Sequence, residues 1–200
     1  MNKIVFCFLL LLCGQHLLAQ VPLDSAGRNP QYVATIIARS EKIVKTLNLS
    51  DQTKAGNVRN IIVNRYFKLN DIYARHKDKD SLYADLYQHH FEFAADLANY
   101  LDDKQIEAVK DGMTFGVVPK TYQAHLEMIP TLKDVEKLQI LNWLKEAREF
   151  AIDADCAKAK HAWFGKYKGR INNWLARRGY DLKAEREAWY KRINEQKTNK

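Results

Sequence analysis

The stretch "VATIIARSEKIVKTL", residues 33–47, decides the fold class. Its apolar residues recur every three or four positions, which places them on one face of an α-helix. The same spacing continues through most of the chain after Pro30, and no segment carries a convincing strand pattern. The sequence therefore predicts an all-α protein, a single-domain array of seven or eight helices.

The segment "GMTFGVVP", residues 112–119, interrupts the helical pattern. Two glycines and a proline among apolar residues predict an irregular, buried corner between helices. Backbone conformations that only glycine adopts easily are expected there. Elsewhere Ser50 is the expected N-cap of the second helix. Residues 131–134 resemble a capping box, and Gly179 lies where glycine commonly ends a helix.

The N-terminal residues 1–19 have the pattern of a signal peptide. A short positive start precedes the apolar run Ile4–Cys13, and Ala19 offers a small residue at the cleavage position. The alternative is a lipoprotein with Cys13 as the lipidated residue, which Leu12 disfavours because a small residue is required there. No later stretch is apolar for long enough to cross a membrane. We therefore expect an exported protein, periplasmic or extracellular after cleavage near Ala19.

The mature chain of about 180 residues suits one domain, residues 30–197, after a flexible lead-in at 20–29. Cys156 is its only cysteine, so no intramolecular disulfide is expected. We interpret Cys156 as a small, partly buried helix residue, since no activating Cys–His spacing is visible. Loss of Lys3 with the signal peptide lowers the formal net charge from +8 to +7, which favours anionic partners.

The stretch "KHAWFGKYKGRINNWLARRGYDL", residues 160–182, holds the densest mixture of aromatic and basic residues. On a helix, one face is apolar and includes Tyr167, while Gly165 and Gly169 lie on a face of small residues that would allow another backbone to approach closely. A narrow polar stripe and the border beside it carry the remaining candidates. The stripe holds Lys166, Arg170, Asn173 and Arg177, and the border holds Trp163 and Trp174.

Indole rings beside fixed cations are what carbohydrate recognition uses. Sugar C–H faces stack on flat aromatic rings, and sugar hydroxyls or carboxylates accept hydrogen bonds from Lys, Arg and Asn. The same residues could stack bases and neutralise phosphates. They could also be structural, with the tryptophans covering the edge of the core and the cations forming a solvated face. The spacing alone leaves these alternatives open.

Two further groups of residues are candidates for a site. The first is the irregular turn with Lys110, Asp111 and Thr114, together with Tyr122, which could hold a ligand through backbone groups. The second is a polar network of acidic and basic side chains. It would contain Arg148, Glu149, Asp153, Asp155 and His161. Paired carboxylates can perform acid–base chemistry, but Asp153 and Asp155 fit better as the cap of the following helix.

No metal or cofactor is predicted. His89 and His90 are adjacent, so on a helix they point about 100° apart rather than toward one ion. No nucleophile elbow, P-loop or dinucleotide fingerprint occurs. No catalytic residue is assigned.

Two long segments resemble an uncharacterised family of exported, all-helical proteins. They are "KDGMTFGVVPKTYQAHLEMIPTL", from Lys110, and "ILNWLKEAREFAIDADCAKAKHAWFGKYKGRINNWLARRGYDL", from Ile140. The resemblance runs from about Tyr32 to Trp189. The family is found in polysaccharide-degrading bacteria and is catalogued as a domain of unknown function with a provisional sugar-binding label. The resemblance implies a role in polysaccharide utilisation and carries over no catalytic residue.

The first functional expectation is an exported, carbohydrate-associated protein. It would bind an oligosaccharide or polysaccharide in an aromatic and basic cleft between the corner at residues 110–122 and the helix at residues 163–177, and the charge of +7 favours an acidic one. The alternative is a periplasmic helical chaperone or envelope-stress protein with a concave face for unfolded clients. A third alternative is a lyase or hydrolase acting on uronic sugars through Lys110, Asp111, Arg148 or Glu149. Nucleic acid is not an expected partner, because an exported protein rarely meets it, and the oligomeric state stays open.

Overall fold

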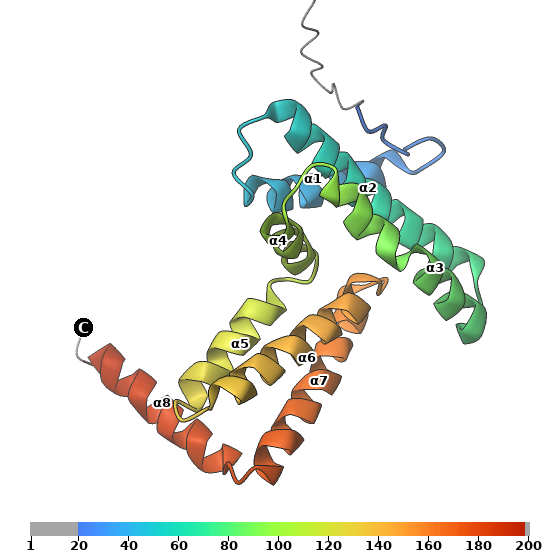
Figure 1. The fold of residues 1–200 in the computed structure, drawn as a ribbon. Coiled ribbons are helices and arrows are strands. Elements are labelled where there is room, and N and C mark those ends of the chain that lie inside the picture. Colours follow the sequence, from blue (N-terminus) through green and yellow to red (C-terminus); the bar gives the residue numbers. More distant parts are fainter. Residues whose placement is uncertain (1–19, 199–200) are drawn as a thin grey trace, which may run out of the picture.

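The structure is a computed structural model that describes residues 20–198. Eight helices and no strand occur in this range, which confirms the predicted all-α, single-domain fold (Figure 1). The helices are α1 (Pro30–Lys45), α2 (Gln52–Arg75), α3 (Lys79–Ala98), α4 (Asp103–Met113), α5 (Val117–Met128), α6 (Asp134–Ile152), α7 (Ala157–Arg177) and α8 (Leu182–Thr198).

Helices α1–α4 form one group around a shared apolar core. Val58 and Ile62 of α2 are fully buried and meet Leu97 of α3 and Val109 of α4. The lead-in before α1 lies along α2, where the Asn60 side-chain amide donates to the Val21 carbonyl at 2.7 Å. The predicted helical faces therefore form the core that their spacing indicated.

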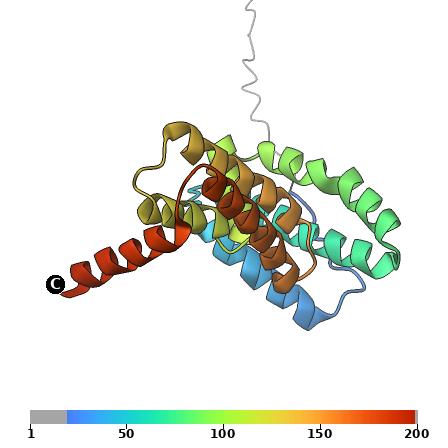
Figure 2. The same cartoon turned by 90° about the horizontal axis from the view of Figure 1, so that it is seen from below.

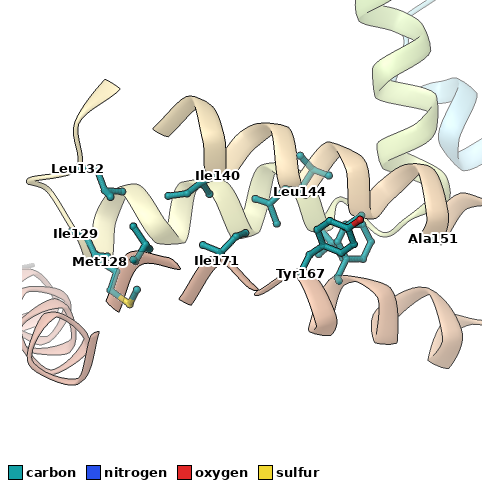
Figure 3. Packing of buried hydrophobic residues seen from close by; sticks show 13 residues of the cluster. Met128, Ile129, Leu132, Ile140, Leu144, Ala151, Tyr167 and Ile171 are labelled. Carbon is teal, nitrogen blue, oxygen red and sulfur yellow. The ribbon is translucent and has the colours of Figure 1, made fainter. Parts of the chain in front are cut away.

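Helices α5–α8 form the second group. Ile140 and Leu144 of α6 pack with Ile171 and Leu175 of α7, all completely buried, and α5 covers their other side (Figure 3). Ile152 at the end of α6 instead joins the core of the first group. The two groups therefore meet along α4 and the last turns of α6 (Figure 1).

The corner between α4 and α5 joins the two groups. Phe115 and Gly116 both have φ of 63°, so two consecutive residues are left-handed and the chain turns sharply. Glycine at position 116 was expected to supply such a conformation, and this is confirmed. A bulky residue at positive φ is strained. The Phe115 ring stacks on that of His161, with the two ring centroids 5.1 Å apart.

The first glycine of the corner segment has a different role. Gly112 lies inside α4, and a Cβ added there would approach Ile43 Cγ2 of α1 to 2.9 Å. Because isoleucine is branched at Cβ, its side chain cannot easily move aside. Close helix approach therefore requires glycine at position 112. The expected close approach at Gly165 and Gly169 is wrong, since added Cβ atoms there would meet nothing within 4 Å.

This difference gives a stability prediction. Gly112→Ala should destabilise the protein by about 1 kcal/mol or more, because overpacking outweighs the gain in helix propensity. Gly165→Ala and Gly169→Ala should each stabilise it by about 0.5–1 kcal/mol, since both glycines lie in open helix interiors. Urea denaturation of the three variants tests this, and a stabilised Gly112→Ala would contradict the packing argument.

Two predicted helix starts are displaced by a short distance. Asp51 rather than Ser50 caps α2, and its carboxylate accepts from the backbone of Thr53 at 2.8 Å. Helix α6 begins after Lys133 rather than at residue 131, with the Glu136 carboxylate accepting from the Lys133 backbone amide at 2.9 Å. Neighbouring residues offer similar capping chemistry, and the position of the packed helix decides which one is used.

The connection between α6 and α7 corrects two predictions. Asp153 does not start the next helix but is the C-cap of α6, and it is buried. Cys156 is the N-cap residue of α7 and is exposed rather than partly buried. The predicted stop at Gly179 is confirmed, because its φ of 95° follows directly after α7.

Helix α8 extends away from the other helices at the C-terminal end (Figure 2). None of its residues is fully buried, although Trp189 packs partly against the core of the second group. Within residues 20–198, every helix is too short or too polar to cross a bilayer. The predicted signal peptide, residues 1–19, lies outside the described residues.

Candidate functional site

Four aromatic side chains from α6 and α7 lie together on one flank of the second group, and we call them the aromatic surface. Trp163 stacks on Phe150 with ring centroids 4.7 Å apart and planes 18° apart. Trp174 meets Trp143 edge-on at 5.2 Å. Trp143 and Phe150 are seven residues apart on α6, which is about 10 Å along the helix axis. The aromatic surface thus consists of two ring pairs separated along one direction.

Cations lie over the rings of the aromatic surface. Lys166 Nζ is 5.0 Å from the Trp163 ring centroid, and the Arg170 guanidinium is 4.5 Å from that of Trp143. Arg178, which was not among the predicted site residues, has its guanidinium carbon 4.3 Å from the Trp174 ring centroid. Lys166 and Arg170 are exposed, and cation–π contacts at such positions contribute only about 0.5–1 kcal/mol. An anionic ligand could therefore draw these cations away from the rings.

The other predicted residues of α7 lie around this surface. Tyr167 is buried in the core, and burial, assisted by the nearby Glu146 carboxylate, raises the pKa of its hydroxyl to about 12. Asn173 is exposed on the same helix. His161 and Trp163 point about 160° apart around α7, at 100° per residue. His161 accordingly stacks on Phe115 and not on the aromatic surface.

The predicted cleft between the corner and α7 therefore splits into separate places. Phe115 and His161 meet at the corner, and Tyr122 packs at the edge of the core. Thr114 is fully buried, and its hydroxyl donates to the Lys110 carbonyl at 2.8 Å. Among residues 20–198, no hydrogen bond, ring contact or ion pair joins Thr114, Phe115 or Tyr122 to Trp163, Lys166 or Arg170.

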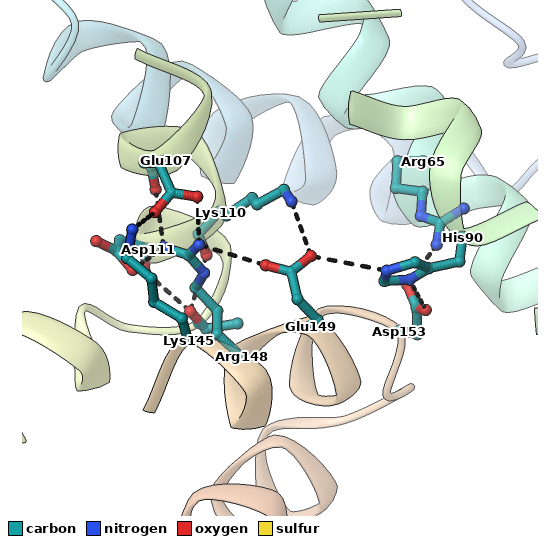
Figure 4. A network of polar contacts seen from close by, with 10 residues as sticks. Arg65, His90, Glu107, Lys110, Asp111, Lys145, Arg148, Glu149 and Asp153 are labelled. Carbon is teal, nitrogen blue, oxygen red and sulfur yellow. Dashed lines mark hydrogen bonds and ion pairs between the residues drawn. The ribbon is translucent and has the colours of Figure 1, made fainter. Parts of the chain in front are cut away.

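The charged candidates form a continuous set of ion pairs where the two groups of helices meet, and we call it the junction network (Figure 4). Arg148 is 1 % exposed, and its guanidinium contacts Asp111 at 2.8 Å and Glu149 at 3.3 Å. Lys110 pairs with Glu149 at 2.7 Å, and Glu107 receives both Arg148 and Lys145. Lys110, Asp111, Arg148 and Glu149 thus neutralise one another, which leaves them poorly placed to act on a substrate.

The junction network continues to α2 and α3. His90 of α3 lies 3.7 Å from Glu149 and contacts Asp153 through Nδ1 at 2.6 Å. The second oxygen of Asp153 receives the Arg65 guanidinium, whose other end donates to the His89 carbonyl at 2.8 Å. The expected network of Arg148, Glu149 and Asp153 is therefore present, with His90 in the place expected for His161.

A cavity of about 500 Å³ lies between α1, α2 and the segment that follows α6. We call it the tyrosine cavity. Its chemistry comes from Tyr32, Arg39, Tyr66, Asn70, Tyr73 and Asp155, which all line it. Burial raises the pKa of the three tyrosines, for Tyr73 to about 12 with a contribution from Asp155 and Asp153, so the phenols stay neutral well above pH 7.

Lys160 lies next to this cavity. It is 4 % exposed, its Nζ is 5.9 Å from the Tyr66 ring centroid, and it donates to the Ile152 carbonyl at 3.3 Å. Burial lowers the pKa of its ammonium to about 8, although the carboxylate of Asp153 opposes the shift. A buried lysine with a strongly lowered pKa beside a cavity is a common mark of a functional site.

Comparison with known proteins assigns the family. The sequence profile of the family described as "Protein of unknown function (DUF3826)" matches residues 33–83 and 77–195. The chain belongs to the DUF3826 family. This confirms the predicted resemblance to an uncharacterised, all-helical family, whereas export and sugar binding stay predictions. No curated protein matches the chain.

The sequence pattern of this DUF3826 protein did not predict the tyrosine cavity. A signal for it does exist, since Tyr32 and Arg39 are seven residues apart, as are Tyr66 and Tyr73. Seven residues are close to two helical turns, so each pair occupies one face of its helix. That the two faces meet, and that Lys160 lies beside them, depends on helix packing. Among residues 20–198 of the DUF3826 protein, no group of three potential ligand side chains could hold a metal ion.

Proposed function

We propose that the protein is exported and binds an acidic oligosaccharide along the aromatic surface of α6 and α7. The observation that carries the proposal is the pair of aromatic contacts, Phe150 with Trp163 and Trp143 with Trp174, each with a cation over a ring. Their separation of about 10 Å along α6 allows an extended chain of sugars to contact both pairs. Export rests on the sequence of residues 1–19 alone.

The energetics favour an acidic ligand over a neutral one. A ligand that stacks on Trp163 or Trp143 must displace Lys166 or Arg170, which costs about 0.5–1 kcal/mol for each contact. A carboxylate recovers this cost, because a hydrogen bond to a charged group contributes about 1.5–3 kcal/mol. A neutral hydroxyl contributes about 1 kcal/mol and recovers little beyond the cost. Asn173 adds a neutral donor and acceptor on the same helix.

Calorimetric titration with tetragalacturonate tests this proposal. Trp174→Ala should weaken binding about tenfold, which corresponds to about 1.4 kcal/mol of lost stacking. Trp189→Ala is the matched control, since Trp189 is also half-buried but lies on α8 and stacks on Tyr190. Circular dichroism verifies that both variants fold, and Trp163→Ala replaces Trp174→Ala should the latter unfold. Equal affinity of wild type and a folded tryptophan variant would refute the proposal.

One observation favours the chaperone alternative. Tyr83, Tyr87 and Phe91 of α3 are 55 %, 70 % and 63 % exposed, and their spacing of four residues lines them up on one side of the helix. An exposed aromatic row of this kind suits the binding of apolar segments of unfolded proteins. Such binding would not depend on Trp174, so the same variants distinguish it from oligosaccharide binding.

A further inference from the structure

The tyrosine cavity has the features of a ligand site separate from the aromatic surface. Its volume of about 500 Å³ is within the usual range for small-molecule sites, about 300–1,000 Å³. Its lining combines apolar ring faces with phenol, amide, guanidinium and carboxylate groups. None of its lining residues belongs to the aromatic surface, which lies in the other group of helices.

The charges around the cavity leave positive charge available for a ligand. The carboxylate of Asp153 is already held by Arg65 and His90. Arg39 is exposed at the cavity and forms no ion pair within residues 20–198. Lys160 adds a second cation, whose one protein hydrogen bond in this range goes to a neutral carbonyl. Among the described residues, Asp155 is the only carboxylate that lines the cavity.

We propose that the tyrosine cavity binds a small hydroxylated carboxylate, of the size of one sugar-acid ring. Arg39 binds the carboxylate, the charge of Lys160 attracts it, and the phenols and Asn70 exchange hydrogen bonds with the hydroxyl groups. A guanidinium is well suited to the first role, since its planar donors match a carboxylate. The three tyrosine rings supply the apolar walls against which the C–H faces of a ring pack.

The charge of Lys160 makes this binding depend on pH. The basic and phenolic groups that face Lys160 and the cavity are Arg39 from α1 and Arg65, Tyr66 and Tyr73 from α2. The acidic groups are Asp153 and Asp155 from the segment at the end of α6, and His90 of α3 contacts Asp153. The tyrosines stay neutral because burial raises their pKa, and Lys160 loses its proton as the pH rises through about 8. Affinity for a carboxylate should therefore fall between about pH 7 and about pH 9.

Calorimetric titration of the full mature protein with D-glucuronate tests the proposal, with D-glucose as a ligand that lacks only the carboxylate. Glucuronate should bind at least tenfold more tightly than glucose at about pH 7. The preference should shrink several-fold at about pH 9. Glucose 6-phosphate tests whether any anion on such a ring suffices. If it binds more tightly than glucuronate, the cavity is a phosphate site and the proposal of a carboxylate ligand is overturned.

Four variants locate the binding. Arg39→Met should weaken glucuronate binding at least tenfold, and Lys160→Met should weaken it and remove its pH dependence. Arg59→Met is the matched control, because Arg59 lies on α2, lines a different cavity and should leave affinity unchanged. Absence of saturable glucuronate binding at millimolar concentration, equal affinity for glucose, or unchanged affinity in Arg39→Met would each overturn the proposal. Trp174→Ala should leave glucuronate binding intact, so this site and the proposed oligosaccharide site can fail separately.

Discussion

Asp153→Asn is expected to destabilise the protein by about 3–5 kcal/mol. The carboxylate receives the Arg65 guanidinium on one oxygen and His90 on the other, and the Arg65 side chain is only 3 % exposed. Breaking a buried ion pair by removing one partner is strongly destabilising, because the remaining charge cannot return to water. Within residues 20–198, Asp153 is the only carboxylate that pairs with Arg65, and the Nε of Arg65 is buried without a hydrogen bond.

The same change should also uncouple the two groups of helices. All four tryptophans belong to α6, α7 and α8, so their fluorescence reports on the second group, whereas far-ultraviolet circular dichroism reports on every helix. In wild type the two signals should change together as urea is added. In Asp153→Asn we expect separate transitions, because Asp153 connects the end of α6 to α2 and α3.

Asp155→Asn provides the control for this experiment. Asp155 is two residues away and exposed, so its substitution should change the free energy of unfolding by less than about 0.5 kcal/mol. If Asp153→Asn is as stable as Asp155→Asn, the junction network does not hold the two groups together.

Lys160→Met is expected to stabilise the protein by about 3 kcal/mol at about pH 7. Burial lowers the pKa of Lys160 from 10.5 to about 8, and each pKa unit corresponds to about 1.4 kcal/mol. The folded state disfavours the charged ammonium, so the cost is complete below about pH 8. It disappears as the pH rises from about 8 toward 10.5, where the unfolded chain also loses the proton. The advantage of Lys160→Met should shrink over the same interval.

Urea denaturation at about pH 7 and about pH 10 measures this effect. Lys158→Met is the control, since Lys158 is exposed on the same helix and should change stability by less than about 0.5 kcal/mol at either pH. Destabilisation by Lys160→Met at about pH 7 would mean that Asp153 stabilises the ammonium more than burial costs. A residue that lowers stability by about 3 kcal/mol is commonly retained for function, which agrees with the proposed ligand site beside it.

Much of the fold follows from local pattern. The spacing of Ile36, Ser40 and Ile43 predicted a helix over 33–47, and α1 spans Pro30–Lys45 with these three residues buried. Gly179 follows the end of α7 as expected, and Asp102 caps α4. Such features depend on a few neighbouring residues and on the 3.6-residue period, so the chain itself carries them.

The candidate site was less predictable. The helical period correctly separated the buried face of α7 from Trp163 and Trp174, but it could not say that Arg170 would lie over Trp143 of α6. It also could not pair Asp153 with Arg65, since the two residues are 88 positions apart. Contacts of this kind depend on loop lengths and on the angles at which helices cross.

The sequence by itself determined the helices, most of their boundaries and the face that each one buries, because these properties are set within one or two turns of chain. Only the tertiary structure decided which helices meet. It placed the contacts of His161 and Trp163 on different flanks and paired the charged side chains of α4 with those of α6. It also brought Tyr32, Arg39 and Tyr66 together around a cavity beside Lys160. The physical reason is that the packing of the whole core determines which charged groups and rings come into contact. That packing is set jointly by many weak contacts between residues far apart in the chain.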